Sequence, residues 1–212
     1  MRSKFFLIFC IVSLSGMANP LLSIKVLIDR YQSIQTYQVT IHSAHLNGVD
    51  EIRYFYQKPG FVRMEFIEPH AGAVLIYSPK SDEVRVWPFG VGRFPWFDLK
   101  PGNPLVLSPH GQRIDRSDVG SLLVNLATLE SNGRTESLGE ELVDGVLTQH
   151  LAVIGRESFV LGQVHRFDVW VDVMYQFPVK IVSTNLQGAT IETVLMTSLR
   201  INEPFPNSLF NP

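Results

Sequence analysis

Histidine side chains are the first candidates for chemistry in this chain of 212 residues. His42 and His45 are three positions apart, and on a β-strand this spacing sends the two side chains to opposite faces, where they cannot share a metal ion. The sequence therefore favours two surface histidines. Its only cysteine, Cys10, excludes both a disulfide scaffold and a thiolate zinc cluster.

Acidic residues occur as the pairs Glu140-Glu141 and Asp168/Asp172. Either pair could supply a general acid and a general base, but each also fits a solvated strand edge or face, which is the interpretation we favour. The sequence has no Gly-x-Ser-x-Gly elbow, phosphate loop, dinucleotide glycine pattern or His-Glu-x-x-His motif. We therefore predict no catalytic residue, no cofactor and no metal site.

Apolar side chains at alternate positions suggest binding instead of catalysis, because alternation places these side chains on one face of a sheet. Such a face forms a protein core as readily as a binding surface. However, a large sheet with few helices is expected to leave part of its concave face uncovered, and an unfilled concavity would hold a ligand. The predicted cleft residues are Tyr54, Tyr56, Val62, Met64, Phe66, Val169, Val171, Ile181 and Leu195.

Two cations accompany the first of these strands. Lys58 lies at a strand end, and Arg63 is one residue out of phase with the apolar positions, so it is expected on the opposite face of the sheet or at its rim. A solvated cation is the simpler interpretation of each, and a basic rim of the cleft is the alternative.

The charge composition excludes some classes of binding partner. The formal net charge is −2, and the chain has no run of Lys or Arg. Nucleic-acid binding and electrostatic binding to anionic membranes both need a basic patch, so neither is predicted.

The N-terminus has the features of a cleaved secretory signal peptide over residues 1–18. Arg2 and Lys4 precede a short apolar run, and Gly16 and Ala18 supply the small residues that signal peptidase accepts. The apolar run is shorter than the roughly 20 residues that span a bilayer. We therefore expect an exported protein that is soluble after cleavage, with residues 19–212 as one domain.

The elements that must position these residues are mostly strands. Helical spacing of apolar residues predicts one helix within residues 19–37 and another over 115–129, capped by Asp115 or Ser117. Period-two alternation and turn residues predict about ten or eleven strands elsewhere. In the strand around Asp168 we expect one buried and one wet face, and residues 88–111 form a long loop carrying exposed aromatics. The fold class is mainly β (α+β), with one antiparallel sheet that must curl because of its size.

Five ordered segments carry a family resemblance. They are KPGFVRMEF, GAVLIYSPKSDEVRVWP, VDGVLTQHLAVI, RFDVWVDVMYQFPVKI and LRINEPFPNSLF. In this order they resemble the bacterial periplasmic lipoprotein-carrier family, the LolA-type half-barrel, and related outer-membrane lipoprotein-sorting proteins. The resemblance implies an incomplete antiparallel β-barrel of eleven strands, with helices over a concave face that receives acyl chains. It also implies that the basic residue before the first hairpin proline, Lys58 here, helps to hold the lid closed.

The resulting hypothesis is a non-enzymatic periplasmic carrier that binds acyl chains of lipoproteins or lipids and delivers them towards the outer membrane. Its expected partners are the acylated ligand and membrane-bound donor and acceptor proteins, and we expect a monomer. An envelope-stress sensor or regulatory interaction module on the same fold is the alternative. The predicted lid consists of Phe94, Trp96, Phe97, Leu122 and Leu123, and the predicted basic rim or latch consists of Lys58 and Arg63.

Overall fold

The computed structural model describes residues 22–211 of the chain. The predicted signal peptide, residues 1–18, lies outside the described residues. In the part that the structure describes, none of the helices has the length and apolar character needed to cross a membrane.

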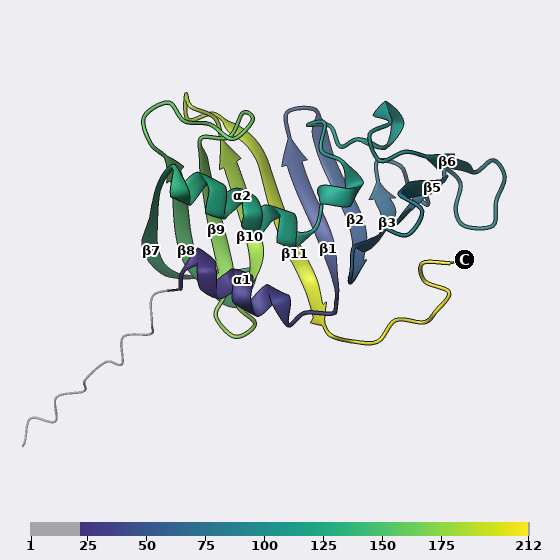
Figure 1. Cartoon of the computed structure of the whole chain (residues 1–212), viewed down its shortest axis with the longest axis horizontal. Helices are drawn as coiled ribbons and strands as arrows, with labels where there is room; N and C mark the ends of the chain where they lie inside the picture. Colours follow the sequence, from purple (N-terminus) through teal and green to yellow (C-terminus); the bar gives the residue numbers. More distant parts are fainter. Residues whose placement is uncertain (1–21, 212) are drawn as a thin grey trace, which may run out of the picture.

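A single sheet of eleven antiparallel strands forms the body of the protein, as Figure 1 shows. The spatial order is β6-β5-β4-β3-β2-β1-β11-β10-β9-β8-β7, so β6 and β7 are free edges and the sheet does not close. This confirms the predicted incomplete barrel. The strands are β1 (Thr36–His45), β2 (Gly48–Gln57), β3 (Phe61–Glu68), β4 (Val74–Ser78), β5 (Glu83–Trp87), β6 (Phe97–Leu99), β7 (Gly133–Val143), β8 (Val146–Gly155), β9 (Arg166–Asp172), β10 (Phe177–Thr184) and β11 (Thr190–Ile201).

Tight hairpins connect most neighbouring strands. Asp144 and Gly145 join β7 to β8 with φ values of 49° and 78°, the left-handed backbone of a two-residue hairpin turn. Leu46 and Asn47 join β1 to β2, and Gly48 is already the first residue of β2, where it pairs with His45. The hydrogen-bonded ladder between β1 and β11 pairs the first strand with the last, so it joins segments that are far apart in the sequence. The two halves of the chain therefore meet at the centre of the sheet.

Two helices cover one face of the sheet, which we call the inner face (Figure 1). Helix α1 spans Ile24–Gln32 and helix α2 spans Val119–Ser131. Two short 3-10 turns, η1 (Pro104–Val106) and η2 (Ile114–Arg116), precede α2. The predicted caps of α2 are wrong by one to three residues. Asp115 belongs to η2 and Ser117 ends it, so the carboxylate that caps α2 is that of Asp118, which accepts the Gly120 amide hydrogen at 2.8 Å.

Apolar residues fill the space between the helices and the inner face. The main core joins Leu27 of α1 and Leu126 of α2 to Val62 and Val169 of the sheet. A smaller cluster lies on the opposite, outer face, where the C-terminal segment covers β2 to β5. It contains Val74, Ile76, Trp87 and Phe210, with Phe55, Phe61, Phe205 and Leu209 packed around it. The sheet is therefore buried on both faces along part of its length.

Strand β9 departs from the prediction of one buried and one wet face. Asp168, Trp170 and Asp172 are buried like the valines between them. Neighbouring strands supply polar and aromatic cover on the outer face: the His150 ring stacks on Trp170 with a centroid distance of 4.1 Å, and Lys180 Nζ lies 4.1 Å from the centre of the same indole. The alternation of residue types in β9 reflects two differently packed faces, not one exposed face.

Asp168 is held as a carboxylate in this cluster. Burial opposes its ionisation, but hydrogen bonds from Arg166, at 2.6 Å to each oxygen, and from His150 at 2.9 Å outweigh burial and lower the pKa of Asp168. A carboxylate whose pKa is lower in the folded state stabilises the fold above its unfolded-state pKa of about 4. That contribution disappears as the pH falls through the folded-state pKa.

We expect Asp168→Asn to lower stability at neutral pH and to flatten its dependence on pH below about pH 5, because the variant has no carboxylate to protonate. Urea unfolding at a series of pH values measures both effects. Asp144→Asn is the matched control, since Asp144 is exposed in a hairpin turn and makes no side-chain hydrogen bond with the described residues. An equally steep acid dependence in Asp168→Asn would contradict this assignment.

The two histidines behave as the strand spacing predicts, with one exception. His42 contacts Thr197, and His45 contacts Asp50 at 3.1 Å, so they have separate partners. The exception is that the His45 side chain is only 4% exposed, because the His110 ring packs edge-on against it. Among residues 22–211, His, Cys, Asp and Glu side chains form no group of three that could hold a metal ion.

Candidate ligand-binding cleft

A cleft of about 1240 Å³ opens beside the first half of α2. Three further segments enclose it: α1, the chain from Pro109 to Asp118, and the β8–β9 loop around Leu161. Small-molecule sites commonly have volumes of roughly 300–1,000 Å³, so this cleft is large enough for an extended ligand. Its apolar lining consists of Ile28, Leu122, Leu123, Val124, Leu161, Val164 and Phe167.

Polar groups occupy the part of the cleft formed by the segment before α2. Arg113 forms a salt bridge with Asp115 at 2.8 Å, so its charge is already matched, and Arg116 is exposed. Gln163 of the β8–β9 loop also lines the cleft. An apolar lining with a few polar groups at the edge suits a ligand with a hydrocarbon part and a polar end.

Hydroxyl groups of tyrosines fasten the start of α2 to the rest of the structure. The Val119 amide donates to Tyr37 Oη at 3.1 Å, and Tyr54 Oη lies 3.0 Å from Ser117 Oγ. Tyr31 of α1 donates to Asp118 Oδ2 at 2.8 Å. The first turn of α2 is thus tied to β1, β2 and α1 by specific polar contacts. The rest of the helix is held by apolar packing and, near its end, by Thr135 of β7, which donates to Glu130 at 2.7 Å.

Glycine is required where α1 and α2 approach each other. A Cβ atom placed on Gly120 would lie 2.6 Å from Cε1 of Tyr31 and 2.6 Å from Asp118 Oδ2. Any side chain at this position would therefore push the Tyr31 ring away from the carboxylate that it contacts. The absence of a side chain allows the contact between the two helices.

The tyrosines in this cluster remain neutral. Burial is the largest cause of the raised pKa values of Tyr31, Tyr37 and Tyr54, and the negative charge of Asp118 raises them further. Neutral hydroxyls can act as both donors and acceptors, so each tyrosine can take either role in the contacts that hold α2.

Lys58 contacts the C-terminal end of α1, next to Tyr31. Its Nζ donates to the carbonyl oxygen of Gln32 at 2.6 Å and lies 5.9 Å from the centre of the Tyr31 ring. Carbonyl groups in the last turn of a helix lack helical partners, and a cation there stabilises the helix end. Lys58 therefore links the β2–β3 hairpin to the C-terminal end of α1.

The predicted cleft residues lie beneath the helices rather than in the open cleft. Tyr54, Tyr56, Val62, Val169, Val171 and Ile181 are buried in the main core, and Met64 packs against it. Phe66 is half-buried near the end of β3, against the His70 ring. None of these residues is among those that line the cleft of 1240 Å³.

Leu195 requires a correction. It pairs with His42 and Lys180, whereas its neighbours Val194 and Met196 pack into the main core. Since side chains alternate along a strand, Leu195 lies on the outer face and cannot belong to an inner-face cleft. Arg63 also lies on the outer face, where it donates to Glu65 at 2.8 Å and to the carbonyl oxygen of Leu209 at 2.8 Å. This is the opposite face that its position in the strand predicts, so Arg63 does not reach the helices on the inner face and cannot latch them.

The predicted lid residues are not brought together. Leu122 and Leu123 of α2 line the cleft, with Leu123 buried. Phe94, Trp96 and Phe97 belong to the loop before β6 and to β6 itself, at the opposite edge of the sheet from β7 (Figure 1). Because β6 pairs with β5, the loop is carried past the end of the sheet instead of folding over the inner face.

Sequence reasoning missed several cleft residues. Ile28, Val164 and Phe167 all line the cleft, and Asp118 anchors its helical wall. Ile28 lies four positions after Ile24 and three before Tyr31, a spacing that could have added it to the apolar face of the first helix. The β8–β9 loop gives no comparable signal, since its position over the sheet depends on contacts distant in sequence.

No known family profile and no curated protein sequence matches the chain. Solved structures do. An uncharacterised conserved protein from Thermus thermophilus is 11% identical, with a TM-score of 0.56 over 90% of this chain and 94% of that one. Lipoprotein LppX from Mycobacterium tuberculosis is 15% identical, with a TM-score of 0.52 over 87% of this chain and 99% of LppX. The chain shares the fold of these proteins, and here that fold is an open antiparallel sheet with two helices on one face.

The same fold occurs in a protein captured with a partner. MucB, in the MucA/MucB complex of Pseudomonas aeruginosa, is 16% identical, with a TM-score of 0.54 over 88% of this chain. The chain spans 60% of the length of that MucB chain. At these identities the likeness establishes the fold alone, and the ligand must be argued from the cleft.

Proposed function

We propose that this LolA-like protein is a periplasmic carrier that holds the acyl chains of a lipid or lipoprotein and delivers them towards the outer membrane. The observation that carries the proposal is the cleft of about 1240 Å³ along α2, lined by Leu122, Leu123 and Phe167. Exposing an acyl chain of 16 carbons to water costs roughly 12 kcal/mol of free energy, at about 0.8 kcal/mol for each methylene. A carrier must offer apolar surface to such a chain, and the apolar residues that line this cleft support that role.

Movement of α2 would enlarge the cleft. Tyr54, Tyr56 and Val62, three of the residues predicted to bind the ligand, lie in the core beside α1 and the segment that leads into α2. The first turn of α2 is held by a few hydroxyl contacts, and α1 is held at its end by Lys58. We infer that α1 and α2 together form the lid, that Lys58 helps to keep it closed, and that the observed structure is the closed state.

We expect Leu122→Glu to weaken binding of a fluorescent fatty-acid probe by at least about tenfold, because a buried carboxylate against a hydrocarbon chain is strongly unfavourable. Fluorescence titration of the purified protein measures the affinity. Leu142→Glu is the matched control, since Leu142 is an exposed residue of β7 outside the cleft.

The carrier proposal fails if the unmodified protein does not bind the probe. Unchanged affinity in a folded Leu122→Glu protein, checked by its thermal unfolding, would instead place the ligand away from α2. Equal losses in Leu122→Glu and Leu142→Glu would indicate an effect of added charge alone.

A regulatory interaction module is the second candidate, and the fold shared with MucB supports it, because MucB was solved in complex with MucA. In that case the cleft or an exposed loop would bind a protein segment instead of an acyl chain. Native mass spectrometry of the protein purified from the periplasm distinguishes the two. Co-purified lipid supports the carrier, and a stoichiometric protein partner without lipid supports the regulator.

The remaining parts of the proposal follow from the same carrier function. Residues 19–212 would form one domain after removal of the signal peptide, and the protein would act as a monomer without enzymatic activity. Membrane-bound donor and acceptor proteins would supply and remove the ligand. Mass determination of the mature protein checks the cleavage site after Ala18.

A further inference from the structure

The loop between β5 and β6 exposes an unusual concentration of apolar side chains. Phe89, Val91, Phe94, Trp96 and Phe97 are all exposed within nine positions, and Phe94 is exposed to 88%. Isolated exposed apolar residues are common on soluble proteins, but contiguous ones mark an interaction site. We call residues 88–97 the aromatic loop.

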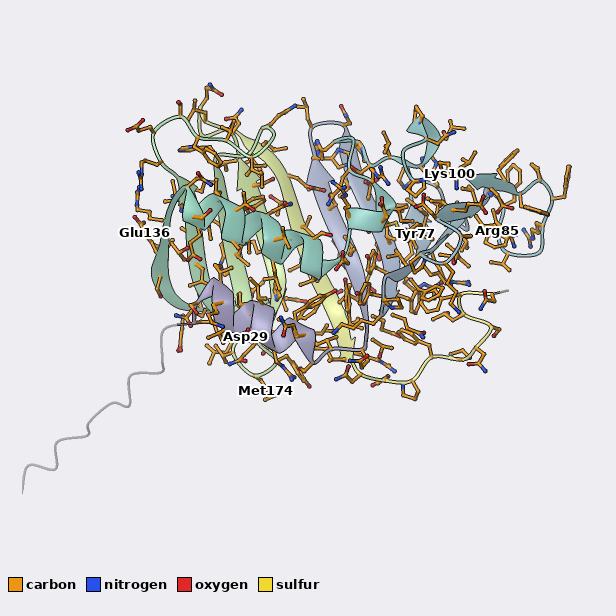
Figure 2. The ribbon with its side chains drawn as sticks, viewed as in Figure 1. Asp29, Tyr77, Arg85, Lys100, Glu136 and Met174 are labelled. Atoms are coloured by element: carbon orange, nitrogen blue, oxygen red, sulfur yellow. The ribbon has the colours of Figure 1, made fainter. Side chains whose placement is uncertain are left out.

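The aromatic loop projects from the molecule. Figure 1 shows it beyond the end of the sheet, at the edge formed by β6 and away from α2. Its base is fixed by Arg85, which forms two hydrogen bonds with Asp98 at 2.6 Å and 3.0 Å and lies 4.9 Å from the centre of the Trp96 ring. Arg85 and Lys100 lie together at this end of the sheet in Figure 2. The loop is therefore held in an exposed position.

Charge in the aromatic loop also favours one kind of partner. Residues 88–97 include no acidic residue, and Arg93 is exposed and makes no ion pair with any described residue. Exposed Phe and Trp beside an unpaired cation suit the boundary between lipid headgroups and acyl chains, where the rings enter the apolar layer and the cation remains near phosphate groups.

We propose that the aromatic loop inserts into the surface of a lipid bilayer and docks the protein there transiently. Attraction comes mainly from the apolar side chains, so it requires no basic patch, consistent with a net charge of −2. A protein partner is the competing occupant: a hollow of about 340 Å³ between the loop and β5, lined by Trp87 and Phe94 among others, could accept a side chain. The projecting shape favours the membrane.

The protein contains its own reporter of insertion. Of the three tryptophans, all within residues 22–211, Trp96 is 49% exposed, whereas Trp87 and Trp170 are 5% and 8% exposed. Transfer of Trp96 from water to lipid should shift the emission of the protein to shorter wavelength. We expect this shift with vesicles of neutral phosphatidylcholine as well as with vesicles that also contain anionic phosphatidylglycerol, and we expect high salt to change it little.

The test is co-sedimentation with these vesicles combined with tryptophan emission. Phe94→Asp should lower the bound fraction at limiting lipid by about tenfold, because it replaces a side chain that enters the membrane with a charge. Leu46→Asp is the matched control, since Leu46 is 95% exposed in the β1–β2 turn, and it should bind like the unmodified protein. Trp96→Phe should retain binding but lose the emission shift.

Several results would overturn the proposal. They are the absence of vesicle binding by the unmodified protein, equal binding by Phe94→Asp, or an equal loss in Leu46→Asp. A photo-crosslinker at position 94 that captures a specific protein, with no binding to vesicles, would assign the loop to a protein partner. The fatty-acid probe separates this proposal from the carrier function, because Phe94→Asp should leave probe affinity unchanged.

Discussion

Replacing Tyr37 with alanine is expected to lower the free energy of unfolding by about 3–5 kcal/mol, the range found for loss of a buried aromatic ring. Tyr37 is 1% exposed at the centre of the tyrosine cluster. Its ring lies 5.0 Å from that of Tyr56, 5.9 Å from that of Tyr54 and 5.2 Å from that of Phe177. Alanine would leave a cavity at the point where β1, β2 and β10 meet the helices.

Tyr37→Phe separates the hydroxyl from the ring. This variant keeps the packing but leaves the buried Val119 amide without the acceptor 3.1 Å away, which should cost about 1–2 kcal/mol. Urea unfolding followed by circular dichroism measures both variants. If phenylalanine and alanine cost the same, the hydrogen bond to α2 would be the dominant contribution and the ring packing would matter little. A cost below about 1 kcal/mol for alanine would show that the cluster collapses around the cavity.

The strands could be predicted because the sequence signals that define each strand lie within a few neighbouring residues. Alternation of apolar residues and turn pairs such as Asp144-Gly145 determine where a strand ends and the next begins. Strand β6 escaped prediction because it has only three residues, Phe97–Leu99, within a segment rich in proline and glycine. Such a short strand exists only because β5 offers an edge to pair with.

The sequence does not show which face of the sheet a residue lies on where a strand is apolar on both sides. Val194, Leu195 and Met196 are consecutive, so their residue types cannot show which of them points inward. The core contacts of Val194 and Met196 decide it. The same ambiguity explains β9, where Asp168 resembles a solvated residue until Arg166 and His150 are seen to surround it.

The candidate site was harder to predict than the sheet, because it depends on where the helices rest. Period-two patterns identified Tyr54 and Val62 as inner-face residues, and they are. The position of α2 determines which inner-face residues are covered and which space stays open. That position depends on contacts such as Tyr31–Asp118, between residues 87 positions apart in the sequence. Composition likewise indicated that the aromatics of residues 88–97 are exposed, but it could not place them at the opposite edge of the sheet from β7.

Asp118 offers the sharpest test of whether α2 moves. Its carboxylate caps α2 through the Gly120 amide, accepts the Tyr31 hydroxyl at 2.8 Å and accepts the Ser121 hydroxyl at 2.8 Å. Asp118→Ala removes all three contacts and should destabilise the start of α2 by about 2 kcal/mol. If α2 is the lid, its open state becomes more populated, and the fatty-acid probe should bind at least about tenfold faster.

Asp118→Asn is the matched control, because asparagine is also a good helix cap and its side-chain oxygen can still accept the Tyr31 hydroxyl. Stopped-flow fluorescence measures the association rate, and hydrogen exchange of the amides in the first turn of α2 measures local opening. Faster exchange together with faster probe binding in Asp118→Ala, and neither in Asp118→Asn, would identify this turn as the moving part of the lid. Faster exchange with an unchanged association rate would show that the ligand enters by another route, so that α2 is a fixed wall of the cleft.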